Sequence, residues 1–570
     1  MEDKITMQIK AMLYDVGRDL AGDEKHYKEI IERLAEYGYN MMVLNLEYRF
    51  CFPSHPEIGM PDGLTPETVR KLDKFAKSCG VELVPFMNCA GHCNGIGMTE
   101  KYNHLCADDR CTKQVEQLRI NTPEAEQLVF DLYNDLYDCF SSKYFHVGGD
   151  EIRWLDKLYP DLEPDERMRQ CVDFLNRVIQ DVKSKGKIPM LWGDMLLKYP
   201  SVLEHLDPDV IICDWSSFTS PELKQLSNIK TLSFFKNAKR PTMFVDGASA
   251  CFGNPIIANN ATMNVVHGSN EYLELFGDES PGIMITVWEI QYGGFFDVVW
   301  PWLYLQSRIN AGEKRDFRSF SFLGEYTALE WGLPEGDDTL EQWHKLMDVE
   351  FSKFVMYEAF LDKRLRPALE INGNRPFKLM RWFYNSLFCN RNILPLLNEE
   401  RNAWLTPYMV EKIEEIYRKA LMLAERMNKL AVKRKEEARH LLQYNRVMLN
   451  VIELVKLEAT FEQCYHEAAE VQFADAVQYR NKMNELKDIC LAMAEKADAL
   501  VDWVNILYKE SNYAADACVM PRMSAEELRK RADNIDKIAE SGVALVSYLR
   551  FIRRDADLPM VRHIGRDLTK

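Results

Sequence analysis

Two adjacent acidic residues, Asp150 and Glu151, are the part of this sequence best suited to chemistry. They lie in the stretch YFHVGGDEIRW at residues 144–154, where an aromatic and β-branched run is followed by two glycines. Such a run is typical of a buried strand, so we expect the acids at the point where a strand ends. Gly148 and Gly149 permit close backbone approach and unusual dihedral angles there. Neighbouring carboxylates repel each other, which indicates that a function keeps them together.

Similar short apolar runs recur along the first part of the chain, and each ends at a polar or aromatic residue. The predicted strands are Lys10–Tyr14, Met41–Leu46, Glu82–Phe86, Tyr144–Val147, Ile188–Trp192, Val210–Asp214, Thr242–Val245 and Gly282–Val287. Nearly continuous apolar runs are typical of parallel strands that are buried on both faces. Helical patterns lie between several of them, at Tyr27–Tyr37, Pro66–Cys79, Pro123–Phe140 and Asp165–Lys185. We therefore predict a (β/α)8 TIM barrel over residues 1–335. A doubly wound open sheet is the alternative, but no G-x-G-x-x-G motif follows the first strand.

The residues that follow each strand of such a barrel line one mouth. Here these residues are Asp15 and Arg18, Asn45 and Glu47, Asn88 and His92, Asp150 and Glu151, Trp192 and Asp194, Asp214 and Trp215, Asp246, and Trp288 and Glu289. Aromatic walls with a few convergent polar groups suit a small amphipathic ligand such as a sugar ring. A single tryptophan more often belongs to a core, but the shared position of three after strands favours a binding site.

Paired carboxylates can cleave a glycosidic bond, one as the acid and the other as the nucleophile or base. Adjacent residues on one backbone do not readily reach opposite faces of a sugar. A different division fits better: one protonates the leaving oxygen, and the other holds a nucleophile that belongs to the substrate. A metal site formed by His146, Asp150 and Glu151 is an alternative, although His146 lies inside the strand. A non-catalytic carbohydrate-binding or scaffold barrel is another, and the presence of both acids disfavours it.

Several motifs carry a family resemblance. HVGGDE at 146–151 matches the His-x-Gly-Gly-Asp-Glu motif of family 20 glycoside hydrolases, the β-N-acetylhexosaminidases. DVGR at 15–18 looks like the family's Asp-x-x-Arg, AGH at 90–92 is similar to its Pro-Gly-His, and VWE at 287–289 resembles its Trp and Glu after strand eight. INTPEAEQLVFDLYNDL at 120–136 resembles the segment that leads into strand four. The resemblance covers about residues 8–331.

The resemblance implies an exo-acting, retaining enzyme that removes terminal β-linked GlcNAc or GalNAc by substrate-assisted catalysis. It makes Glu151 the general acid and then the base. It makes Asp150 the residue that orients the 2-acetamido group and stabilises an oxazolinium intermediate. His92 and Glu47 would form a relay behind Glu151. A glycosidase of altered, non-acetamido specificity is the alternative.

The resemblance also implies a set of substrate-binding residues. Arg18 and Glu289 would hold ring hydroxyls, and Trp192, Trp215 and Trp288 would enclose the acetamido methyl and the ring. FVDGASACFGN at 244–254 lacks the tyrosine that the family places after strand seven, and Tyr292 is the candidate substitute. His146 and Asp194 complete the expected set.

The composition changes after Trp331, where GLPEGDD at 332–338 forms a cluster of helix breakers. Beyond it, apolar residues recur at three- and four-residue steps, which predicts long helices at Tyr408–Lys433, Lys435–Glu470, Phe473–Ser511 and Ser524–Phe551. The stretch Leu449–Leu457 is apolar nearly all round, which is typical of a central, buried helix. We predict an α-helical domain over residues 340–570 that supports the barrel or forms a homodimer.

The composition of the whole chain limits the classes of binding partner that we expect. The 570 residues carry a formal net charge of −17, which argues against nucleic acid and anionic membrane. We expect no membrane span, no cofactor, and, without a visible signal peptide, a cytoplasmic location. The 14 cysteines form no disulfide framework. Cys89, Cys93, Cys106 and Cys111 lie near His92 and His104, and the alternatives for them are a zinc site and free thiols in a loop.

Overall fold

The computed structural model describes residues 9–17, 22–60, 63–97, 99–107, 117–215, 229–247, 264–288, 296–316, 319–350, 407–509, 519–542 and 544–545. The chain divides into two compact units. The first consists of Met1–Gly253, Asn260–Ile290 and Val299–Ser319, and the second of Asn254–Asn259, Gln291–Val298 and Phe320–Lys570. The strands all lie in the first unit, and the long helices α18 to α21 lie in the second.

Eight parallel strands close into a barrel in sequence order, β1 to β8, with β1 pairing β8. The strands are β1 (Ile9–Asp15), β2 (Met41–Asn45), β3 (Glu82–Phe86), β4 (Tyr144–His146), β5 (Ile188–Trp192), β6 (Ile211–Asp214), β7 (Thr242–Gly247) and β8 (Gly282–Val287). The predicted TIM barrel is therefore confirmed, and the strand ends differ from the prediction by a residue or two. Because all strands run the same way, their carboxyl ends meet at one mouth.

A helix follows each strand. These helices are α1 (Glu24–Glu36), α2 (Pro66–Ser78), α4 (Pro123–Tyr137), α6 (Pro164–Ser184), α7 (Asp194–Lys198), α8 (Ile229–Asn237), α10 (Ser269–Phe276) and α11 (Trp300–Asn310). Shorter helices α3 (Asn94–Gly97) and α5 (Leu155–Leu158) lie in the loops after β3 and β4. Side-chain caps fix several starts: Thr65 and Thr122 each accept a backbone N–H three residues on and are each followed by proline.

Alternate residues of the strands fill the interior of the barrel. The inward side chains form one buried cluster: Ile9, Ala11, Leu13, Met41, Val43, Val84, Phe86, Tyr144, Met190, Trp192, Ile211, Cys213, Met243, Val245 and Met284. Branched, thioether and aromatic side chains in this alternation are what a packed barrel core requires. The same alternation carries Asp15, Asn45 and His146 to the upper, mouth-side ends of their strands, pointing inward.

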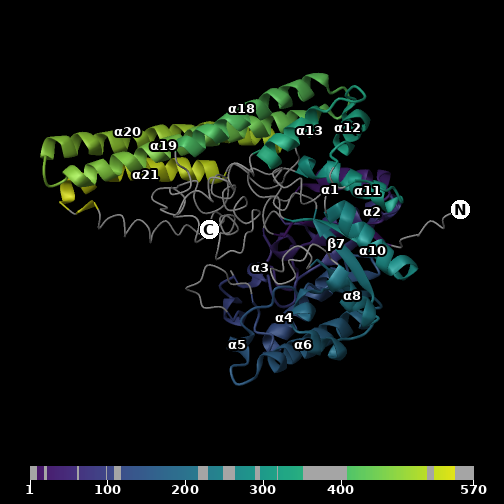
Figure 1. Ribbon diagram of the computed structural model, residues 1–570. Coiled ribbons are helices and arrows are strands. Elements are labelled where there is room, and N and C mark those ends of the chain that lie inside the picture. The colour runs from purple at the N-terminus through teal and green to yellow at the C-terminus, as the bar shows by residue number, and fades with distance from the viewer. Residues whose placement is uncertain are drawn as a thin grey trace. The chain divides into compact units, whose positions relative to one another are not determined.

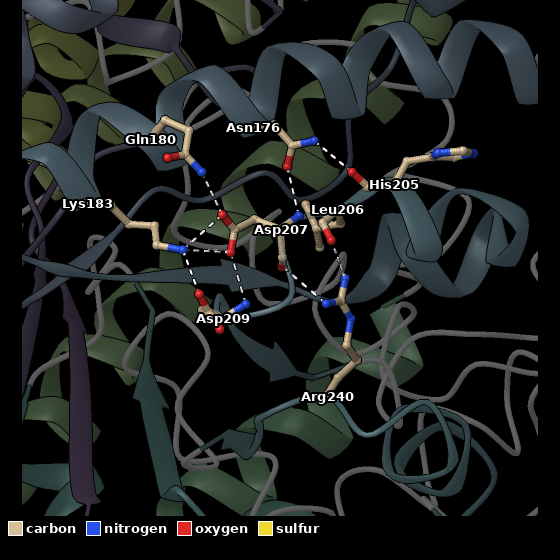
Figure 2. Close-up of polar contacts among 8 residues, drawn as sticks. All are labelled: Asn176, Gln180, Lys183, His205, Leu206, Asp207, Asp209 and Arg240. Carbon is tan, nitrogen blue, oxygen red and sulfur yellow. Dashed lines mark hydrogen bonds and ion pairs between the residues drawn. The ribbon is translucent and has the colours of Figure 1, made fainter.

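A polar network surrounds Asp207 in the loop before β6, at the amino ends of the strands (Figure 2). Its carboxylate accepts two bonds from Lys183 Nζ (3.0 Å each) and one from the Gln180 side chain (2.7 Å). Its backbone N–H donates to Asn176 (2.9 Å), and its carbonyl accepts from Arg240 (3.2 Å). The network joins α6 to the segments that lead into β6 and β7, at the end of the barrel opposite the mouth.

The second unit is built from long helices. They are α18 (Pro407–Leu430), α19 (Lys435–Val471), α20 (Ala476–Lys509) and α21 (Val519–Ser541), and consecutive ones pack side by side (Figure 1). The apolar stretch Leu449–Leu457 lies inside α19, and none of its residues is exposed. The last predicted helix, Ser524–Phe551, was wrong in its bounds. It ends at Ser541 because Gly542 adopts a left-handed φ of 67°, the usual stop for a helix.

Shorter helices precede the bundle: α12 (Phe322–Tyr326) and α13 (Thr339–His344), each followed by a π-helical turn. Glu437 of α19 ties this region to the bundle, because its carboxylate accepts from the Tyr326 hydroxyl (3.0 Å) and the Trp331 indole (2.9 Å). The main segment of the second compact unit, Phe320–Lys570, accordingly includes this region and the breaker cluster at 332–338. Among the helices in the described ranges, none is both long and apolar enough to cross a membrane.

Candidate active site

The loop that carries Asp150 and Glu151 leaves β4 in an unusual backbone conformation. Gly148, Gly149 and Glu151 all have positive φ, at 76°, 88° and 43°. A Cβ on Gly148 would overlap the Asn88 side-chain oxygen, and one on Gly149 would press on Leu191. The two glycines are therefore required by the backbone angles and by the packing of the protein itself. The positive φ of Glu151 is strained for a side chain of its size, which is typical of functional sites.

The side chain of His92 contacts both acids. Its Nε2 lies 3.4 Å from Asp150 Oδ2 and 3.3 Å from Glu151 Oε2. His92 itself has a positive φ of 53° in the loop after β3. The neighbouring Gly91 lets that loop approach, because a Cβ there would lie 2.8 Å from the Asp150 carbonyl oxygen. The imidazole can therefore share a proton with either carboxylate.

Asp194 supports Glu151 from the loop after β5. Its Oδ2 accepts the backbone N–H of Glu151 at 3.0 Å, which fixes the strained residue. Burial, together with the nearby charges of Asp150 and Glu151, raises the pKa of Asp194 to about 7. The sequence predicted a substrate-binding role for Asp194, whereas its observed contact is with the backbone of Glu151.

Glu47 lies after β2 and is fully buried, with a positive φ of 42°. Its Oε2 accepts the N–H of Gly95 at 3.4 Å, in the loop that also carries His92. The structure thus places Glu47 against the His92 loop, while the proposed relay between the two remains a prediction. Nearby, Asp15 accepts from the Asn45 side chain (2.8 Å) and from the Gly17 N–H (3.1 Å), which ties the ends of β1 and β2 together.

Aromatic rings form the layer of the barrel beside these acids. The His146 ring lies 4.4 Å from Phe86 and 4.3 Å from Trp192, centroid to centroid. Trp192 is buried, and its ring lies 6.0 Å from that of Trp288. Burial lowers the pKa of His146 to about 3, so this imidazole is neutral. Its Nδ1 accepts the N–H of Gly148 at 3.1 Å, which helps to shape the glycine turn.

The predicted tryptophan walls therefore divide into two kinds. Trp192 is a buried supporting residue, while Trp215 and Trp288 are partly buried and pack against the barrel core from the mouth side. Several buried polar atoms here have no hydrogen-bond partner among the described residues: both side-chain atoms of Asn88, Nε2 of His146 and Oδ1 of Asp194. Buried polar atoms without partners are costly, so their concentration at one mouth suits the recognition of a polar ligand.

Three predicted site residues, Arg18, Glu289 and Tyr292, lie outside the described residues, as does Cys111. Among the residues that the structure describes, no group of acids, histidines and cysteines is arranged to hold a metal ion. Cys93 donates to the Gly91 carbonyl at 3.2 Å, and burial raises the pKa of Cys89 to about 12. Burial also raises the pKa of Cys93, so both thiols are protonated at neutral pH.

Two residues near the acids were not predicted. Arg153 Nη2 lies 3.1 Å from Glu151 Oε2, and the Arg153 backbone N–H donates to Gln117 Oε1 at 3.0 Å. Arg153 follows Glu151 by two positions in the motif that drew attention first. Spacing alone gave no signal, because the direction of its side chain depends on the left-handed turn at Glu151.

Comparison with known families finds a match for the part of the barrel from β1 to β6. Residues 11–233 match the model of the glycosyl hydrolase family 20 catalytic domain. This part of the chain is similar to the catalytic domain of glycoside hydrolase family 20. The matched residues include Asp150, Glu151, His92, Glu47 and Asp194.

Individual relatives are distant. A lacto-N-biosidase of Bifidobacterium bifidum is 27% identical over 165 residues, which cover 26% of this chain and 14% of that protein. Beta-hexosaminidase 1 of Coccidioides posadasii is 26% identical over 261 residues, which cover 40% of this chain and 42% of the relative. The chain thus spans less than half the length of either relative. A solved beta-N-acetylhexosaminidase from Bacteroides fragilis aligns with a TM-score of 0.45 at 16% identity, covering 57% of this chain and 70% of that one.

Proposed function

We propose that this protein is an exo-acting, retaining β-N-acetylhexosaminidase that removes terminal β-linked GlcNAc or GalNAc. One observation carries the proposal: the carboxylates of Asp150 and Glu151 converge on Nε2 of His92, at the mouth of a family 20 barrel. A side-by-side acid pair cannot flank a sugar ring. It can serve two neighbouring groups of one substrate, the leaving oxygen and the 2-acetamido group.

In the proposed reaction, Glu151 donates a proton to the leaving oxygen while the acetamido oxygen attacks the anomeric carbon. The glycosidic bond breaks as the new C–O bond forms, which gives an oxazolinium ion. Asp150 accepts a hydrogen bond from the acetamido N–H and stabilises the positive charge that develops. Glu151, now a carboxylate, then takes a proton from the water that opens the ring. Two displacements at one carbon retain its configuration.

The remaining residues support these two acids. His92, within 3.4 Å of both, holds their orientation and buffers the proton on Glu151, with Glu47 bracing the His92 loop. Asp194 fixes the Glu151 backbone. Trp215 and Trp288, which are partly buried against the barrel core, are proposed to pack against the sugar, and Arg18, Glu289 and Tyr292 are proposed to complete the site.

The test is the release of nitrophenol from the matched β-N-acetylglucosaminide, β-N-acetylgalactosaminide and β-glucoside. We expect turnover of the acetamido substrates, poor turnover of the glucoside, and a first product with the β configuration by NMR. Inhibition by a thiazoline mimic of the cyclic intermediate should accompany this.

Other outcomes would favour the alternatives. A protein that binds GlcNAc without cleaving any of the three would be a carbohydrate-binding barrel. One that cleaves the glucoside best would be a glycosidase of altered specificity, and loss of activity on treatment with a chelator would favour metal-dependent hydrolysis.

A further inference from the structure

The proposed acid, Glu151, has a second nitrogen donor on the oxygen that faces His92. Arg153 Nη2 lies 3.1 Å from Glu151 Oε2, and His92 Nε2 lies 3.3 Å from the same atom. Donors of this kind, one of them permanently cationic, favour the ionised carboxylate. A general acid, however, must carry its proton when the substrate is bound. The ion pair therefore opposes the first step of the proposed reaction unless the guanidinium acquires another partner.

Contacts of the Arg153 backbone hold this residue beside Glu151. Its backbone N–H donates to Oε1 of Gln117, and Gln117 is buried. The next residue, Leu118, donates its N–H to the Ala90 carbonyl (2.8 Å), in the loop that carries His92. The Arg153 segment is thus anchored to the loop of the proposed relay residue. The left-handed turn at Glu151 then brings two side chains that are two positions apart to the same side.

The Arg153 side chain is free to change partners. It is 51% exposed, and the side chain of Glu151 is 40% exposed. An ion pair this open to water contributes little, so little is lost when it breaks. The guanidinium keeps its planar set of donors, which matches a carboxylate or a sulfate with two parallel hydrogen bonds.

We propose that Arg153 is a binding site for an anionic group on the aglycone, a carboxylate or sulfate on the sugar that carries the leaving oxygen. The inference rests on the proposed function, because it assigns the substrate class of the same site. An anionic aglycone takes the guanidinium from Glu151. The carboxyl group then loses this cationic partner and retains the proton that it delivers to the leaving oxygen. A neutral aglycone leaves the ion pair in place.

The other charged groups around Glu151 fit this exchange. Among the described residues, it faces His92 from the loop after β3 and Asp150 on its own loop, and its backbone N–H meets Asp194 from the loop after β5. Both neighbouring acids, when ionised, oppose a further negative charge. Once Arg153 has turned to the substrate, they favour the protonated form of Glu151.

The test uses two substrates with the same terminal GlcNAc and the same linkage, one with a glucuronic acid aglycone and one with glucose. We expect wild-type kcat/KM to be about tenfold higher for the acidic aglycone, the value of one good charge-assisted contact. Arg153→Gln should remove this preference, mainly by lowering kcat/KM for the acidic substrate. Arg153→Lys should keep part of it. A third substrate with a sulfated glucose aglycone shows which anion binds better.

Two further readings separate this role from a structural one. On the glucose substrate, the alkaline limb of the kcat/KM profile should move to higher pH in Arg153→Gln, because the cation that favours the carboxylate is gone. Lys157→Gln is the matched control, since Lys157 is an exposed cation on the next turn that lies 4.0 Å from the Trp154 ring centroid. It should leave both the preference and the pH profile unchanged.

The nitrophenyl substrate distinguishes failure of this inference from failure of the proposed function. If wild type does not cleave the nitrophenyl N-acetylglucosaminide, the proposed function is wrong. If wild type cleaves it but treats the acidic, sulfated and neutral aglycones alike, the inference about Arg153 is overturned. It is equally overturned if a preference exists and Arg153→Gln retains it.

Discussion

The two ends of the barrel treat their acidic residues in opposite ways. At the amino ends of the strands, Asp207 and Asp209 share Lys183, and Asp207 also accepts from Gln180 (Figure 2). At the mouth, Asp150, Glu151 and Asp194 lie close together, with a histidine and a half-exposed arginine as the nitrogen partners described. At the amino ends, a lysine lies between two acids, whereas at the mouth three acids lie close to one another.

The pKa values of acids at the two ends of the barrel shift in opposite directions. Lys183 lowers the pKa of Asp209, so that carboxyl is ionised at neutral pH. Burial and two neighbouring acids raise the pKa of Asp194 to about 7, so near neutral pH this carboxyl group can gain or lose a proton. Acids that are paired stabilise a fold, whereas acids that are crowded and buried are held ready for proton transfer. The difference predicts which substitutions will change activity and which will change stability.

The largest effect should follow from Glu151→Gln. The amide cannot protonate the leaving oxygen, and general acid assistance contributes about 10²–10⁴-fold. We expect that loss in kcat/KM for a disaccharide, whose leaving group is poor. Nitrophenyl substrates need less protonation, so their first step should suffer less. Equal losses across a series of leaving groups would contradict the assignment of Glu151 as the acid.

Asp150→Asn should come next. The substitution keeps the size of the side chain but removes the charge that stabilises the oxazolinium, and one such contact is worth about 10²–10³-fold. The loss should appear in kcat far more than in KM, because the contact strengthens in the transition state. Affinity for the thiazoline mimic should fall with it. A covalent glycosyl ester trapped on either acid, with the thiazoline inert, would restore an ordinary two-carboxylate mechanism.

Asp194→Ala should lower kcat by about 10- to 100-fold, the range expected when a reacting group is slightly misplaced. The alanine leaves the N–H of Glu151 without its acceptor, so the left-handed turn is no longer fixed. Asp194→Asn is the matched control, since the amide oxygen can still accept that N–H. If both variants lost activity equally, the charge of Asp194 would matter rather than its hydrogen bond.

Asp194 should also give the stability of the protein a pH dependence. Its folded pKa, about 7, lies above its ordinary value of 3.8, so between these pH values the folded protein holds a proton that the unfolded chain has released. The stabilisation is complete below about pH 4 and is lost as the pH rises through 7. The unfolding temperature should therefore fall less between pH 5 and pH 8 in Asp194→Asn than in wild type. An identical fall in both would show that Asp194 does not titrate in this range.

The barrel and the acid pair could be predicted from the sequence because both depend on local residue patterns. Apolar runs mark strands wherever the chain is buried on both faces, and HVGGDE marks the loop after β4. No sequence pattern indicates the contact from Asp194 to the Glu151 backbone or the one from Arg153 to the Glu151 carboxylate. Each depends on the left-handed φ of Glu151, which the residue type disfavours and only tertiary packing imposes.

The same limit applies at the other end of the barrel. Asp207, Lys183 and Arg240 come from three separate segments that meet only when the barrel closes. The apolar pattern predicted their strands and helices but not the network between them. A polar network of this kind depends on the distances and angles between side chains that lie far apart in the sequence, and an apolar pattern along the chain does not contain that information.

The smallest effects should come from a pair of substitutions in that network. Asp207 is nearly buried, with its side chain 7% exposed, and its carboxylate accepts from Lys183, from Gln180 and from the Asp209 backbone N–H. Asp207→Ala leaves Gln180 and the Asp209 N–H without this acceptor and takes one of its two carboxylates from Lys183, which should lower the free energy of unfolding by about 2 kcal/mol. Asp209 also binds Lys183, but its side chain is 73% exposed, so Asp209→Ala should change stability by no more than about 0.5 kcal/mol. Urea denaturation of the whole protein measures both.

Neither substitution should change kcat, because the network lies at the amino ends of the strands and the acids lie at the carboxyl ends. These two variants therefore test whether the two ends of the barrel act independently. A loss of kcat in Asp207→Ala at a temperature where the protein is fully folded would mean that the amino end holds the mouth in shape. An Asp209→Ala variant as unstable as Asp207→Ala would mean that Lys183, rather than the buried carboxylate, is the centre of the network.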